Sequence, residues 1–149
     1  MASQPVTPSL QQKDASDVER TARDFLAALD RKQAIPTEFT SPDLVFVFNS
    51  DKPTDLAGWQ GLVKMWFTAF PGSKHAVESC YVVGDRAFVR SRATGIHKGP
   101  LFDVPASNKP INIIGNIQFT VKNGKLTRAE PVWDMLTIMQ QIGAVPGGK

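Results

Sequence analysis

The strongest structural signal in this sequence is PINIIGNIQFTVKNGKLTRAEPVW, residues 110–133. On both sides of Asn123-Gly124, apolar residues alternate with polar ones, which is the period of a half-buried β-strand. The Asn-Gly pair favours the tight two-residue turn that joins antiparallel strands. We therefore expect two long antiparallel strands, over residues 110–122 and 125–133.

A second hairpin lies upstream of the first. Residues 75–83 and 86–97 alternate in the same way on either side of Gly84-Asp85. Farther upstream, LVFVF at residues 44–48 is apolar on both faces, which indicates a strand buried on both sides. The sequence therefore predicts four long antiparallel strands and one short buried strand.

Three helices accompany these strands. Apolar residues recur at helical spacing over residues 14–32, and residues 54–70 carry a broad aromatic-rich face. A third helix is expected over residues 135–142, because Asp134 suits the N-cap position and Gly143 suits the C-terminal stop. We predict an α+β domain in which a curved antiparallel sheet packs on helices and encloses a cone-shaped apolar pocket.

One domain, residues 14–143, accounts for most of the 149 residues. We expect a disordered N-terminal tail over residues 1–13 and a flexible C-terminal tail over residues 144–149. The 17 Lys and Arg residues are scattered and outnumber Asp and Glu by only three, which argues against a nucleic-acid partner. A single cysteine, Cys80, and the lack of a signal sequence or a long apolar run favour a cytoplasmic protein that does not contact membranes.

Four sequence motifs carry a family resemblance. They are VGDRAFVR at residues 83–90, TGIHKG at 94–99, GNIQF at 115–119 and WDMLTIMQQIG at 133–143. On these motifs the sequence resembles the SnoaL-like polyketide cyclase family, a branch of the nuclear-transport-factor-2-like superfamily. The resemblance implies the cone-shaped fold, no cofactor, and ring closure of aromatic polyketides by an aspartate and histidine acid–base pair.

The positions of that acid–base pair are vacant in this sequence. Counted from the motifs, the histidine of the family falls at Ile117 and its aspartate at Pro131, and neither side chain transfers protons. Three other residues are therefore the catalytic candidates: Asp134, His97 and Glu130. Each also has a structural interpretation, because Asp134 suits a helix N-cap, His97 lies on a glycine-flanked turn, and Glu130 falls on the outer face of its strand.

Strand alternation predicts which side chains line the pocket. The candidate ligand-binding residues are Trp133, Trp66, Phe48, Ile117, Phe119, Ser91, Tyr81 and Asn116. Within this set alternation does not assign Tyr81 to a face, and Asn116 is included because a weaker resemblance to ketosteroid isomerases puts their acid near it. His75, at the start of a strand, is expected to be exposed. No cluster has the spacing of metal ligands.

Two functional hypotheses follow. The first is a cofactor-free cyclase, isomerase or lyase that acts on a polyketide- or terpenoid-like substrate by acid–base chemistry. The second is a non-catalytic module that binds a small hydrophobic ligand or a partner protein, which the apolar residues Ile117 and Pro131 favour. In either case the resemblance implies a homodimer that pairs through the outer face of the sheet.

Overall fold

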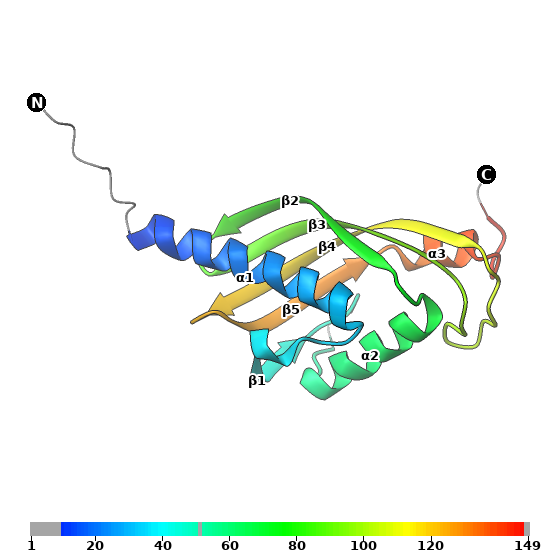
Figure 1. The fold of residues 1–149 in the computed structure, drawn as a ribbon, viewed down its shortest axis with the longest axis horizontal. Coiled ribbons are helices and arrows are strands. Elements are labelled where there is room, and N and C mark those ends of the chain that lie inside the picture. Colours follow the sequence, from blue (N-terminus) through cyan, green and yellow to red (C-terminus); the bar gives the residue numbers. More distant parts are fainter. Residues whose placement is uncertain (1–9, 51, 148–149) are drawn as a thin grey trace, which may run out of the picture.

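Five strands form one curved sheet in the order β1-β5-β4-β3-β2 (Figure 1). The structure is a computed structural model that describes residues 10–50 and 52–147. The strands are β1 (Thr40–Phe46), β2 (Lys74–Val83), β3 (Arg86–Ile96), β4 (Pro110–Lys122) and β5 (Lys125–Trp133). Both predicted hairpins are confirmed, because β2 pairs antiparallel with β3 and β4 with β5. Positive φ angles of 52° at Asn123 and 72° at Gly124 explain why the second turn needs its Asn-Gly pair.

The sheet is mixed, which corrects the prediction of a wholly antiparallel sheet. Strand β1 runs parallel to β5, with Phe46 opposite Ala129. The two strands are far apart in the sequence, and local alternation carries no information about the direction of such a long-range pairing. Strand β1 also begins at Thr40, earlier than the expected start at Leu44.

Three α-helices and one 3-10 turn complete the fold. They are α1 (Leu10–Lys32), the 3-10 turn η1 (Thr37–Phe39), α2 (Leu56–Ala69) and α3 (Met135–Gln141). Helix α1 starts before the predicted start at Asp14, so residues 10–13 are helical. The rest of the predicted N-terminal tail, residues 1–9, lies outside the described residues, as do residues 148–149 of the predicted C-terminal tail. None of the described helices is long and apolar enough to cross a membrane.

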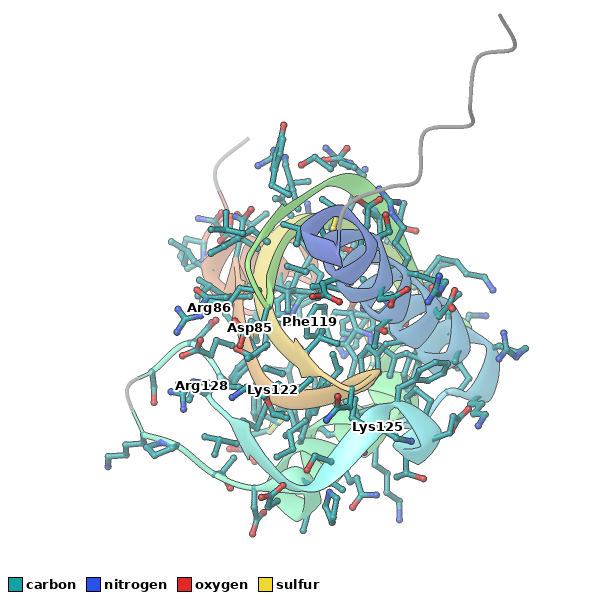
Figure 2. The ribbon with its side chains drawn as sticks, turned by 90° about the vertical axis from the view of Figure 1, so that its left-hand side faces the viewer. Asp85, Arg86, Phe119, Lys122, Lys125 and Arg128 are labelled. Atoms are coloured by element: carbon teal, nitrogen blue, oxygen red, sulfur yellow. The ribbon has the colours of Figure 1, made fainter. Side chains whose placement is uncertain are left out.

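The core fills the concave face of the sheet. The Phe25 ring from α1 lies 5.1 Å from Trp59 of α2 and 5.6 Å from Phe119 of β4, measured between ring centroids. Figure 2 shows the sheet bending around Phe119, with Arg86 and Arg128 on its outer side. These rings are buried on one face of the sheet, and the helices cover that face. This is the predicted α+β arrangement.

Candidate active site

A small cavity lies between the concave face of the sheet and helices α1 and α2. Its volume is about 90 Å³, and its walls are almost entirely aromatic and aliphatic. Met135 of α3 closes one end together with Leu101 and Phe102, from the loop of residues 97–109 between β3 and β4. The predicted apolar pocket is therefore present, although it is narrower than the roughly 300–1,000 Å³ of most small-molecule sites.

Five of the eight predicted ligand-binding side chains line this cavity. They are Trp133, Trp66, Phe48, Ile117 and Phe119. Ser91 lies on the inner face but outside the cavity, and its buried hydroxyl has no hydrogen-bond partner among the described residues. Tyr81 is 68% exposed, because a bulge between Val77 and Ser79 shifts the alternation of β2 and turns it outward. Asn116 is exposed on the outer face of the sheet.

Trp133 forms a flat wall of the cavity because two neighbouring residues hold it. A Cβ atom at Gly115 would lie 2.2 Å from the indole ring, so only glycine lets the ring lie over β4. The Asn49 side chain fixes the backbone of Trp133, accepting a hydrogen bond from its N–H at 2.8 Å and donating to its carbonyl at 2.9 Å. These contacts make the Trp133 wall a rigid part of the site.

The two positions that the family resemblance assigns to an acid–base pair both face the cavity. Ile117 of β4 and Pro131 of β5 are direct cross-strand partners, and both line the cavity. Their side chains are apolar and carry no proton to transfer. This side of the cavity therefore supplies shape and hydrophobic contact only.

The structure does not bring Asp134, His97 and Glu130 together. Asp134 is the N-cap of α3, and its carboxylate accepts hydrogen bonds from the Thr137 N–H at 3.0 Å and the Thr137 hydroxyl at 2.6 Å. These bonds hold the pKa of Asp134 below its usual value. Glu130 lies 3.0 Å from Arg128 in an ion pair, and neither Asp134 nor Glu130 lines the cavity.

His97 is completely buried, but it lies away from the cavity. Its Nδ1 accepts a hydrogen bond from the Ser107 backbone N–H at 3.1 Å and lies 2.9 Å from the Ser107 hydroxyl. Burial lowers the pKa of His97, and the Gly99 backbone partly offsets this shift. Since Nδ1 accepts, the ring proton is on Nε2. His97 is therefore a neutral side chain that fixes the base of the 97–109 loop.

The structure reveals a different pair, His75 and Asp30, which corrects the expectation that His75 is exposed. His75 Nδ1 lies 2.6 Å from Asp30 Oδ1, and the His75 backbone N–H donates to Asp30 Oδ2 at 2.7 Å. The side chains are only 7% and 13% exposed. Because the carboxylate can only accept, Nδ1 is the donor and carries the proton of the neutral ring.

The other nitrogen of His75 is available for chemistry. The ring lines the cavity, and its Nε2 has no hydrogen-bond partner among the described residues. Aromatic rings surround it, with Trp133 at 5.6 Å, Trp66 at 6.1 Å and Phe67 at 6.3 Å between centroids. An imidazole with a fixed tautomer, a carboxylate behind it and a lone pair on Nε2 has the geometry of a general base.

The sequence contained two signals for this pair. Asp30 lies one helical turn after Leu26, in line with Ala22 and Val18 on the apolar stripe of α1, where a charge is unusual. His75 lies two residues before Val77, on the inner face of β2 opposite Ala93. Both signals mark a polar group on a buried face, but the 45-residue separation hides the contact from local patterns.

Within the part of the chain that the structure describes, no group of three or more His, Cys, Asp or Glu side chains is arranged to hold a metal ion. The site therefore consists of one imidazole–carboxylate pair at the side of an apolar cavity.

Comparison with known proteins identifies the family to which this architecture belongs. The model of the SnoaL-like polyketide cyclase family matches residues 17–142, and a search of the curated proteins finds no match. Among solved structures, AclR, a proposed hydroxylase from Streptomyces galilaeus, has a TM-score of 0.83 and 20% identity, over 91% of this chain and 86% of that one. A proposed SnoaL-like polyketide cyclase from Jannaschia sp. CCS1 has a TM-score of 0.80 and 22% identity, over 95% and 100% of the two chains.

A third structure is a proposed polyketide cyclase from Bacillus cereus ATCC 10987. It has a TM-score of 0.73 and 26% identity, and the match covers 93% of this chain and 89% of that one. The family model spans nearly all of the described residues, and these structures share the curved sheet and its helices. The chain belongs to the SnoaL-like polyketide cyclase family.

Proposed function

We propose that this protein is a cofactor-independent enzyme that transfers a proton within a small hydrophobic substrate, with His75 as the base. One observation supports this most strongly: among the described residues that line the cavity, His75 alone has a side chain with a lone pair that can accept a proton from a substrate. Its partner Asp30 and the surrounding rings hold it in one orientation. A fixed base in a dry, apolar site is a common basis for acid–base catalysis.

The proposed step is balanced without an oxidant or a reductant. The Nε2 lone pair of His75 takes a proton from a carbon next to a carbonyl, and the electron pair of that C–H bond moves toward the carbonyl oxygen. The Asp30 carboxylate stabilises the positive charge of the imidazolium that forms. The enolate then takes the proton back from the imidazolium at another atom, attacks a second carbonyl to close a ring whose new alkoxide takes the proton, or expels a leaving group that takes the proton.

A polyketide- or terpenoid-like substrate fits this chemistry. Such molecules present carbonyl groups with acidic neighbouring C–H bonds on an otherwise apolar skeleton. The walls offer hydrophobic contact from Trp66, Trp133 and Ile117, and no Asp, Glu, Lys or Arg side chain lines the cavity within the described residues. We therefore propose an uncharged substrate.

Proton removal from 5-nitrobenzisoxazole tests the proposal, because this neutral bicyclic probe opens its ring when a base takes one C–H proton. We expect His75→Ala and His75→Gln to lower kcat/KM by about a hundredfold or more. Asp30→Asn is expected to cost on the order of tenfold, because an amide stabilises the imidazolium less than a carboxylate does.

The matched controls are Asp134→Asn and Glu130→Gln, the two other carboxylates that the sequence favoured. Both lie outside the cavity, so each variant is expected to stay within about threefold of the unchanged protein. Full turnover by correctly folded His75→Gln protein, checked by circular dichroism, would overturn the assignment of the base.

A non-catalytic binding module is the second candidate, and the apolar pair Ile117 and Pro131 favours it. The same assay separates the two functions. A binding module would take up the probe, measured by calorimetry, yet would show the same rate of ring opening with and without the His75 side chain.

We also propose a homodimer that forms through the outer face of the sheet. Apolar side chains exposed there include Tyr81, Val83, Phe88 and Val132, and burial of such a patch between two copies is favourable. Light scattering on a size-exclusion column measures the mass directly. A cytoplasmic location remains a prediction from the sequence.

A further inference from the structure

Phe102 differs from every other described residue that lines the cavity. Its side chain contacts the cavity, yet the residue is 52% exposed, whereas the other lining residues are buried or half-buried. It belongs to the 97–109 loop, which lies at the same end of the molecule as α3 (Figure 1). One ring therefore contacts both the interior of the site and the solvent.

The loop that carries Phe102 is fixed at its base. The His97 N–H donates to the Lys109 carbonyl at 2.9 Å, and the Asn108 N–H donates to the His97 carbonyl at 2.8 Å. The N–H groups of Lys98 and Gly99 both donate to the Ala69 carbonyl at the end of α2, at 2.9 and 3.1 Å. These bonds tie the two ends of the loop to each other and to α2, so the loop is not free to move as a whole.

The tip of the loop is also closed. Leu101 and Val104 exchange both backbone hydrogen bonds, at 2.9 and 2.8 Å, and the Leu101 side chain is buried. Only Phe102 and Asp103 lie between them. The Phe102 side chain can therefore move without breaking these contacts.

The backbone at Phe102 has a φ angle of +50°, in the left-handed region that favours glycine. A tight turn of this kind ordinarily has glycine at its first central position. A bulky side chain therefore lies at the mouth of the site on a strained backbone, although burial of its half-exposed ring contributes little to stability. Such an outlier is grounds for a functional hypothesis.

The volume of the cavity indicates what the function of Phe102 is. The cavity holds about 90 Å³, whereas a cavity of about 150 Å³ accommodates a single benzene ring. Any cyclic substrate must therefore displace a side chain as it binds. Phe102 can turn toward solvent without disturbing the core, whereas a buried neighbour such as Leu101 cannot.

We propose that Phe102 is the residue that sets the upper size limit of the substrate. Its ring closes the mouth of the cavity, so that uncharged ligands bind more weakly as they grow and must displace more of the ring. This inference rests on the proposed function only in taking the cavity as the substrate site, and it does not depend on His75 being a base.

Binding of neutral probes of increasing size tests the proposal: benzene, indole and the three-ring fluorophore 1-aminoanthracene. Phe102→Ala is expected to bind 1-aminoanthracene at least about tenfold more tightly than the unchanged protein does, with a smaller gain for benzene, which needs less of the space that the Phe102 ring occupies. Phe102→Trp, which keeps the mouth closed with a larger ring, is expected to weaken indole binding about tenfold.

Two further variants separate the effect of the ring from backbone strain and from changes at the surface. Phe102→Gly relieves the backbone strain as well as removing the ring. Its affinities for the three probes are expected to match those of Phe102→Ala, and its melting temperature is expected to be higher than that of Phe102→Ala. Leu136→Ala is the surface control, because Leu136 is 64% exposed on α3 and does not line the cavity. It is expected to leave all three affinities unchanged.

An unchanged 1-aminoanthracene affinity in Phe102→Ala overturns the size limit, as does failure of every variant to bind any probe. The proposed catalysis can fail separately. If His75→Gln turns over 5-nitrobenzisoxazole normally while Phe102→Ala still shows the shift toward larger probes, the base is misassigned and the size limit stands.

Discussion

The two histidines of this chain are both largely buried, yet their partners give them opposite chemical roles. His75 faces a carboxylate through Nδ1, so its Nε2 keeps a lone pair beside the cavity. His97 accepts a backbone N–H at Nδ1, so its proton is on Nε2 and the ring stays neutral in the core. Both rings are largely buried, so the partner of Nδ1 and the place beside the cavity, rather than burial, distinguish the proposed base from the structural histidine.

After the His75 variants, replacement of His97 is expected to have the largest measurable effect that bears on this comparison. His97→Ala removes a completely buried ring and leaves the Ser107 N–H without its acceptor, which should destabilise the fold by about 2–4 kcal/mol. The rate of ring opening of 5-nitrobenzisoxazole per folded molecule is expected to stay within about threefold. Urea unfolding and the same kinetic assay give the two values.

Lys98→Ala is the matched control, because Lys98 is the exposed neighbour of His97 in the same loop. Its free energy of unfolding should change by less than about 0.5 kcal/mol. If His97→Ala left stability unchanged but abolished turnover, the roles of the two histidines would be reversed.

A smaller effect concerns pH. Burial lowers the pKa of His97 below its usual value of 6.5 in the folded state, so the unfolded chain binds a proton that the folded chain does not. The free energy of unfolding should therefore fall as the pH drops below 6.5 toward the folded-state pKa, and this contribution is fully present above 6.5.

The His97→Ala variant has no imidazole at this position, so its unfolded chain does not bind this extra proton. The difference in unfolding free energy between the unchanged protein and His97→Ala should therefore stay constant above about pH 6.5 and shrink as the pH drops from there to about 5.5. A difference that stays constant over this range would contradict a neutral, buried His97.

Much of the fold was predictable because its signals are local. Asn123-Gly124 specifies its own turn, and the period of two in β4 and β5 identifies which residues face inward, including Ile117 and Trp133. The parallel pairing of β1 with β5 was not predictable in this way, since neither strand contains information about the direction of the other.

The site was harder to predict than the fold, and for the same reason. The pocket walls follow from alternation, except where the bulge in β2 turns Tyr81 outward. The functional pair depends on a contact between the end of α1 and the start of β2, which only the assembled fold brings together. The sequence favoured His97 because it lies in a family motif, whereas His75 was expected to be exposed.

The most direct test of the central claim is the proton position on each histidine ring, measured by nitrogen-15 NMR with labelled histidine. The chain has two histidines, so the spectrum contains only two rings to assign. In their neutral forms, we predict that His75 carries its proton on Nδ1 and His97 on Nε2, and that indole shifts the His75 Nε2 signal alone. A His75 ring protonated on Nε2, or one whose signals do not respond to indole, would contradict the account.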